Sequence, residues 1–241
     1  MGFLQQFFRD VFNENQQQQT PAESEKDFGK LSEEMLDLHM KIAKYDDFVL
    51  TDAIRPSIDL KVKPVQGYRH DVYHDEEAGN RIPVVMGAAS KERLFDLFIQ
   101  LIGTLGNEVD VVLESSHHHG QSGHVDLYRE QIEMPILKSI LYDFEDLLLN
   151  DGCTGIAVLN PSLPQEVQLD EHKLLIAYGS PLEPFEHLLE VGGVHCNESM
   201  SFLTESEHIH SSSEEYLRQF EVLKMKLGIE DNPIDDNDLC F

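Results

Sequence analysis

The chain has 241 residues, of which 45 are aspartate or glutamate and 18 are lysine or arginine, so its formal net charge is −27. A field of this sign repels nucleic acid and anionic lipid and favours basic proteins and cations as partners. Hydrophobic residues make up 41% of the sequence, which is close to the usual globular range and predicts a folded core.

The cysteines and the hydropathy pattern predict a cytoplasmic protein. Cys153, Cys196 and Cys240 lie far apart, so they form none of the short-spaced pairs of zinc ribbons or redox motifs. No stretch approaches the ~20 apolar residues of a membrane span. The N-terminus also lacks the features of a secretory signal. We expect reduced thiols, no integral membrane association and a cytoplasmic location.

The first residues carry an amphipathic pattern. Residues 1–12 place five apolar side chains on one helical face, and residues 13–27 are glutamine-rich and typical of a flexible linker. Because the linker offers nothing to pack against, we expect this arm to contact a partner, a second copy or the body of the protein. The predicted interaction residues are Leu4, Phe7, Phe8, Val11 and Phe12.

The body is predicted to be a single domain over residues 28–230, followed by an acidic tail at residues 231–241. It begins with a helix capped by Ser32. Alternation of apolar and polar residues predicts a strand over residues 57–62. Residues 68–87 are predicted to form a hairpin whose second strand, with Pro83, starts at an edge.

After residue 87 the pattern alternates between strands and helices. Helices are predicted over residues 90–102, over residues 125–150 with a break near Pro135, and over residues 182–193 and 211–228. Strands are predicted over residues 108–116, 154–160, 173–178 and 200–205, with an exposed segment at residues 166–172. Near-continuous apolar strands such as "VDVVL" and "GIAVL" indicate burial on both faces. We therefore predict a three-layer α/β fold with a mixed sheet, antiparallel on its N-terminal side, and with helices packed on both faces.

The histidines form the most promising site for chemistry. His117 and His119 follow a predicted buried strand, and His208 and His210 repeat the same spacing. In extended chain two such imidazoles point the same way and can share one metal ion, with Glu114 or His124 as a further ligand. If the two pairs converge, they would form a zinc, iron or manganese site.

Other interpretations compete with this one. In a chain with 12 histidines, chance alone supplies roughly 0.6 His-x-His pairs, and these residues would then be exposed loop imidazoles. His70 and His74 lie in a predicted strand, where roughly 13 Å separates their Cα atoms, which is too far for one ion. Cys153 and Cys196 are expected to be unreactive. The spacings of phosphate loops, dinucleotide-binding loops and serine-nucleophile elbows are absent from the sequence.

Two function classes remain. The first is a non-catalytic interaction or adaptor protein, without a cofactor, that binds a basic protein or itself through its acidic surface and N-terminal arm. The second is a metal-dependent hydrolase built on His117, His119, His208 and His210, with zinc as an example of the divalent ion. The metal content of the purified protein discriminates between them.

Overall fold

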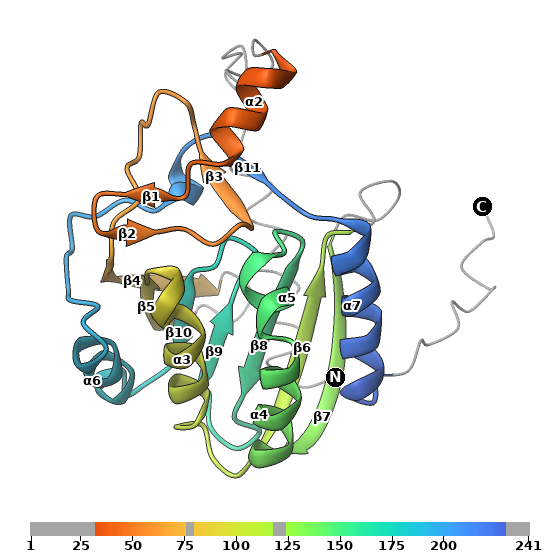
Figure 1. Cartoon of the computed structure of the whole chain (residues 1–241). Helices are drawn as coiled ribbons and strands as arrows, with labels where there is room; N and C mark the ends of the chain where they lie inside the picture. Colours follow the sequence, from red (N-terminus) through yellow and green to blue (C-terminus); the bar gives the residue numbers. More distant parts are fainter. Residues whose placement is uncertain (1–31, 76–79, 118–123, 230–241) are drawn as a thin grey trace, which may run out of the picture.

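The computed structural model describes residues 32–75, 80–117 and 124–229 (Figure 1). The predicted arm with Leu4, Phe7, Phe8, Val11 and Phe12, the linker, the acidic tail and His119 lie outside the described residues. The division of the chain into arm, linker, body and tail therefore stays a prediction.

A seven-stranded sheet forms the centre of the molecule, in the order β4-β5-β10-β9-β8-β6-β7. Every pairing of neighbouring strands in it is antiparallel. The prediction of a mixed sheet is therefore wrong for the described strands. Its strands are β4 (Gly67–Asp75), β5 (Asn80–Ala88), β6 (Glu108–Ser115), β7 (Val125–Glu133), β8 (Thr154–Leu159), β9 (Glu166–Leu169) and β10 (Leu175–Tyr178).

The reason for this topology lies in residues 125–133, where the sequence predicted the first half of a long helix. They form strand β7, which pairs with β6, and the chain turns into a helix only at Met134. Strands β6 and β7 therefore form a hairpin, and residues 134–150, which contain two helices, then lead to β8, which pairs antiparallel with the other side of β6.

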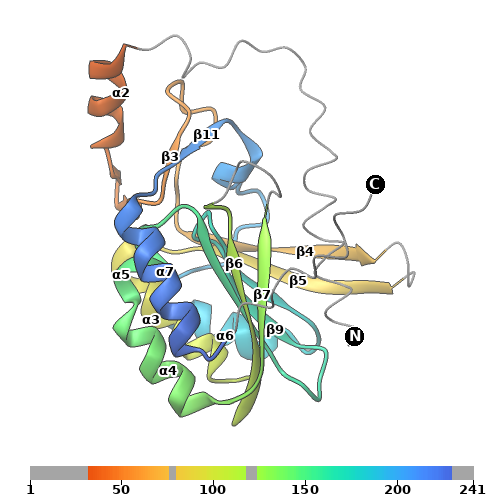
Figure 2. The ribbon, with the colours of Figure 1, turned by 90° about the vertical axis from the view of Figure 1, so that its right-hand side faces the viewer.

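Five helices share one hydrophobic core with one face of the sheet. The core contains Phe98, Leu141, Leu147, Phe185 and Phe220, one from each helix. Figure 2 shows α3, α4, α5 and α7 on the same side of the sheet. A layer of helices on the opposite face, as the sequence predicted, is not confirmed. The helices are α3 (Lys91–Ile102), α4 (Met134–Asp143), α5 (Glu145–Asn150), α6 (Glu183–Val191) and α7 (Glu214–Lys226).

Helix α3 illustrates why these segments fold as they do. Ser90 is the N-cap of the helix. The apolar residues of the helix recur at a spacing of three and four, so that one face of it is buried. Phe98 is fully buried on that face, and burying such a side chain contributes about 1.5–3 kcal/mol. The helix predicted over residues 90–102 is thus confirmed, as are α6 and α7.

The opposite face of the sheet carries a second, smaller hydrophobic cluster with polar side chains among it. Val112, Ala157 and Ile176 belong to this cluster, together with Met200 and Phe202 from the segment after α6. Glu114, Glu166 and Gln168 are also buried. Glu114 leaves no room for a side chain at Gly155, since a Cβ there would lie 2.5 Å from Glu114 Oε2.

Two small sheets and a short helix lie beyond one end of the large sheet, at the top of Figure 1. Strand β3 pairs with β11, and β1 pairs with β2, both in antiparallel fashion. These elements are α2 (Glu33–Met40), β1 (Lys44–Tyr45), β2 (Phe48–Val49), β3 (Ile54–Pro56), the 3₁₀ turn η2 (Leu203–Glu205) and β11 (His208–His210). The Ser32 hydroxyl accepts a hydrogen bond from the N–H of Met35 and caps α2, as predicted.

Several predicted elements differ in the structure. Residues 57–62 form no strand, because Leu60 takes a left-handed backbone conformation with a φ of 49°. The predicted strand at residues 200–205 contains η2, and the strand follows at β11. Pro83 is not at a sheet edge, since β5 lies between β4 and β10. It is tolerated there because the pairing with β10 begins only at Val84.

Candidate metal centre

Four segments that are far apart in the sequence meet at the end of the sheet below β3 and β11. The end of β6 pairs with the start of β8, where Ser115 lies opposite Thr154. The turn between β9 and β10 reaches the same place, because the Lys173 ammonium donates a hydrogen bond of 2.7 Å to the Thr154 carbonyl. Strand β11 joins them through His210, whose Nδ1 lies 2.6 Å from the carbonyl oxygen of Gly152.

Three histidines from two of these segments face one another. The ring centroids of His172, His208 and His210 lie 5.0, 4.8 and 5.1 Å apart in the three pairings. One ligand nitrogen from each lies within 4.8 Å of the other two. His208 and His210 point the same way because side chains two apart in a strand share a face. The group is therefore a three-imidazole set of the kind that holds zinc.

The hydrogen bonds of these rings decide which nitrogen is free. His208 Nδ1 lies 2.8 Å from the carbonyl oxygen of Ser206, His210 Nδ1 has the Gly152 carbonyl described above, and His172 Nδ1 lies 2.9 Å from Asp170 Oδ2. Carbonyl and carboxylate oxygens only accept, so each Nδ1 carries the proton. In neutral rings each Nε2 is then a lone-pair donor, and this outer hydrogen bonding is the pattern found at histidines that bind metals.

Asp170 builds the turn that presents His172. Its backbone carbonyl accepts a hydrogen bond from the N–H of Lys173, and its carboxylate accepts one from the N–H of Leu174 at 2.7 Å. Lys173 closes the turn with a φ of 64°. The carboxylate thus holds both the backbone of the turn and the His172 ring.

Burial and nearby charges set the protonation of the three rings. Burial lowers the pKa of His208 and of His210, and the neighbouring His172 lowers both further. Burial alone would also lower the pKa of His172, but the Asp170 carboxylate outweighs it and raises the value. A metal binds neutral imidazole. The lowered pKa values favour the neutral form of His208 and His210, whereas His172 must lose a proton to solvent before it binds the ion.

A second group of side chains lies beside this one. His117 Nε2 lies 2.9 Å from Asp151 Oδ2, and Cys153 completes a set whose ligand atoms lie within 4.8 Å of one another. Burial alone would raise the pKa of the Asp151 carboxyl, but hydrogen bonds from His117 and other neighbours lower it. Burial also lowers the pKa of Lys173 to about 8.

The structure separates the four histidines that the sequence grouped together. It brings His208 and His210 together, places His117 with Asp151 and Cys153 instead, and leaves His119 outside the described residues. Glu114 is no ligand beside His117, because its carboxylate accepts hydrogen bonds from Gln168. His124 Nε2 lies 3.6 Å from Glu171 Oε1.

His172 is the residue that the sequence analysis missed. It lies in the segment interpreted as exposed, whereas all of β9 is buried and leads directly into the turn at Asp170. An aspartate two residues before a histidine, between two short strands, was the available signal. His70 lies in a strand, as predicted, and both of its ring nitrogens contact carboxylates, at Glu186 and Glu198.

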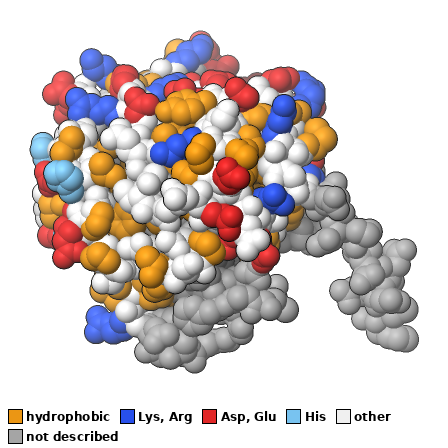
Figure 3. Space-filling view, turned by 90° about the horizontal axis from the view of Figure 1, so that it is seen from below, with side chains coloured by type: hydrophobic (Ala, Val, Ile, Leu, Met, Phe, Trp, Pro, Cys, Tyr) orange, Lys and Arg blue, Asp and Glu red, His pale blue; other side chains and the backbone are white. Residues whose placement is uncertain are grey.

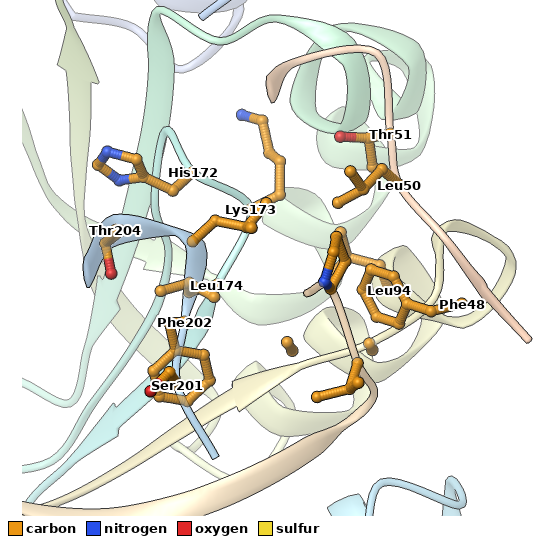
Figure 4. A pocket seen from close by; sticks show the side chains of 15 residues that line it. Phe48, Leu50, Thr51, Leu94, His172, Lys173, Leu174, Ser201, Phe202 and Thr204 are labelled. Atoms are coloured by element: carbon orange, nitrogen blue, oxygen red, sulfur yellow. The ribbon is translucent and has the colours of Figure 1, made fainter. Parts of the chain in front are cut away.

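A pocket opens beside His172 (Figure 4). One wall is formed by Phe48, Leu50 and Leu94, and Leu174 and Phe202 line the pocket as well. Its polar groups are few and include the hydroxyls of Thr51, Ser201 and Thr204. Its volume is about 30 Å³, which is room for about one water molecule.

Comparisons with known proteins give no family for this chain. No protein-family model, no curated protein and no solved structure matches it. In the part of the chain that the structure describes, no helix has both the length and the apolar character needed to cross a membrane.

Proposed function

We propose that the protein is a metal-dependent hydrolase whose ion is held by His172, His208 and His210. The observation that carries this proposal is that one nitrogen of each ring lies within 4.8 Å of the other two, while the hydrogen bonds at Nδ1 leave each Nε2 as the lone-pair atom. Three protein ligands leave a fourth tetrahedral position open for water, as in catalytic rather than structural zinc sites.

The proposed chemistry follows from that open position. A zinc-bound water has a pKa of about 7 and supplies hydroxide at neutral pH. Glu171 is the neighbour of His172 in the chain, and its negative charge acts on His172 and on His210. We assign it as the group that accepts the proton of the water. An ion held by the three histidines would supply such a hydroxide for attack on an electrophilic carbon or phosphorus, and Glu171 would pass the proton taken from the water to the leaving group.

The test is the metal content of the untagged protein, followed by activity. We expect His208→Ala and His210→Ala each to lose the ion of this centre, whereas His187→Ala on α6 keeps it, because His187 is exposed and belongs to none of the ligand groups. Zinc-, manganese- or iron-loaded protein should hydrolyse aryl esters or aryl phosphates, and the two variants should not. Stoichiometric metal without hydrolysis of any such substrate would contradict the enzymatic part. Absence of metal would contradict the whole proposal.

A second proposal is the interaction protein that the charge predicts, acting in the cytoplasm. Helix α2 favours it, since Met35, Leu38 and the following Ile42 are about half exposed beside the acidic first turn of Glu33 and Glu34. An apolar stripe beside carboxylates suits a basic amphipathic segment of a partner. Replacing Met35 and Leu38 by serine should then weaken capture of that partner without changing the melting temperature, and unchanged capture would contradict this proposal.

A further inference from the structure

We propose that Cys153, His117 and Asp151 hold a second metal ion, a structural zinc, beside the three-histidine centre. Their ligand atoms already lie within 4.8 Å of one another. The two closest, His117 Nε2 and Asp151 Oδ2, are 2.9 Å apart. Ligands that bind one tetrahedral zinc at about 2.0–2.3 Å lie roughly 3.3–3.5 Å apart, so small side-chain movements suffice.

The observation that best supports a bound cation is the environment of the Oδ1 atom of Asp151. The residue is completely buried, and its Oδ1 has no hydrogen-bond partner. The other oxygen, Oδ2, is shared by His117 and the Thr154 hydroxyl. A buried carboxylate oxygen without a donor is costly. A cation bound at this carboxylate would satisfy it.

The chemistry of the ligands selects zinc, and their burial shields the ion from solvent. A Cys153 thiolate and the Asp151 carboxylate together balance the two positive charges of Zn²⁺, and sulfur with imidazole is a donor set that zinc prefers. All three side chains are shielded from solvent, with exposed fractions of 9% for Cys153 and 5% and 0% for the side chains of His117 and Asp151. The Phe220 ring of α7 covers His117 at a centroid distance of 5.6 Å. Three protein ligands leave a fourth position for water here as well, but because all three side chains are shielded no substrate reaches it, and we assign the ion a structural role.

The position of the group explains what it would stabilise. Gly152 stands between two of its ligands, and the Gly152 carbonyl is the acceptor that orients His210. No side chain fits there, since a Cβ at Gly152 would lie 2.3 Å from the Ala53 carbonyl oxygen. An ion on Asp151 and Cys153 would therefore fix the backbone that aims one ligand of the neighbouring centre.

Cobalt substitution tests this site without any assay of activity. Cobalt bound to a thiolate gives an intense near-ultraviolet charge-transfer band, whereas cobalt on three imidazoles does not. We expect the band in the cobalt-loaded full chain, its loss in Cys153→Ser, and about half the bound metal in that variant. Cys196→Ser is the matched control and should keep the band. No band in the wild type, or a band that survives in Cys153→Ser, overturns the proposal.

Two further measurements keep the result interpretable. In His208→Ala the charge-transfer band should remain while the other equivalent of metal is lost, so failure of the three-histidine centre and failure of this site give different results. If Cys153→Ser does not fold, alkylation of the wild type decides: zinc should protect Cys153 and leave the exposed Cys196 reactive. Equal alkylation of Cys153 with and without zinc would contradict the site.

Discussion

At the scale of single residues, Glu166 is a buried carboxyl group without a hydrogen-bond partner in the described structure. It is buried in β9, and neither of its carboxylate oxygens has a hydrogen-bond partner. Burial raises the pKa of this carboxyl well above its usual range, and the nearby Glu114 raises it further. The folded state therefore holds a proton that the unfolded state releases.

The raised pKa of Glu166 makes the stability of the folded state depend on pH. A carboxyl with a raised folded-state pKa favours folding most below its unfolded pKa of about 4.3, and the folded state loses stability as the pH rises from there. Replacing Glu166 by methionine removes the buried acid and should stabilise the protein at neutral pH by about 1–3 kcal/mol. The gain should shrink towards pH 4, where the carboxyl is protonated in both states.

Urea unfolding at neutral and acidic pH measures this difference. Glu183→Met is a suitable control because Glu183 is exposed at the start of α6, and such surface changes stay within about 0.5 kcal/mol. A Glu166→Met protein that is less stable than the wild type at neutral pH would show that the carboxylate has a role that the described contacts do not reveal.

Residue types also explain which parts of the site were predictable. His208 and His210 form a metal-ligand pair by spacing alone, so the sequence indicates them without a fold. His172 stands 36 residues before His208 in the numbering, and only the folded chain, in which β11 pairs with β3, brings them together. The structure places His117 beside Asp151 and Cys153, which carry no recognisable spacing to it in the sequence.

At the scale of elements, a protonated histidine joins strand β4 to helix α6. His70 contacts Glu186 of α6 through Nε2 at 2.9 Å and Glu198 through Nδ1 at 2.5 Å. Hydrogen bonds to these two carboxylates raise the pKa of His70. A ring that donates from both nitrogens is an imidazolium, so the clamp depends on its charge.

The clamp predicts a loss of stability as the pH rises. Because the folded-state pKa of His70 is raised, its stabilisation is complete below the unfolded value of about 6.5 and disappears as the pH rises through the folded value. Between about pH 6 and pH 9 the wild type should lose more stability than His70→Gln. Thermal melts across this pH range measure the effect. The control is His187→Gln, which changes a histidine of helix α6. Parallel pH curves for the wild type and His70→Gln would contradict the clamp.

The elements that were predicted correctly share one property: their apolar residues follow the burial of the structure. Helix α3 repeats its apolar residues at helical spacing, and β6 and β8 carry the near-continuous apolar runs of strands that are buried on both faces. Strand β9 buries Glu166 and Gln168 on one face, so its alternating pattern indicated an exposed segment. In β7 a register irregularity between Val109 and Val111 of the partner strand disturbs the alternation, and the remaining apolar residues matched a helix.

At the scale of the whole molecule, the fold class follows from composition and pattern, but the topology does not. The sequence identified a domain of helices and strands around a real core. Whether neighbouring strands run parallel depends on the connections, and the misassigned segments at residues 125–133 and 166–169, which are strands β7 and β9, changed that conclusion. The metal ligands depend on the same topology, because His172 comes from the turn between β9 and β10 whereas His208 and His210 come from β11.

The net charge of −27 also acts at this scale. On the face seen in Figure 3, acidic and basic side chains are interspersed with hydrophobic ones. Among the described residues, Arg69 pairs with Glu205, Lys91 with Asp52 and Arg218 with Glu215. Such exposed pairs contribute little each. With 45 acids against 18 bases, most carboxylates have no basic side chain to pair with, so repulsion between them opposes folding.

Added salt should therefore raise the melting temperature of the free protein. Exposed charges are screened beyond about 8 Å at physiological ionic strength, and between Leu94 and Glu230 the sequence has 24 acidic and 6 basic residues, so screening removes more repulsion than attraction. DNA and RNA should not bind at moderate salt, because the protein has few lysine and arginine side chains to replace the counterions of the phosphates. Melting curves across a sodium chloride series and a nucleic-acid gel shift check both statements. The series should be run on metal-loaded and on chelator-treated protein, because loss of bound ions would expose buried carboxylates and lower stability at every salt concentration. A melting temperature that falls with salt in the metal-loaded protein would mean that local ion pairs outweigh the excess of negative charge.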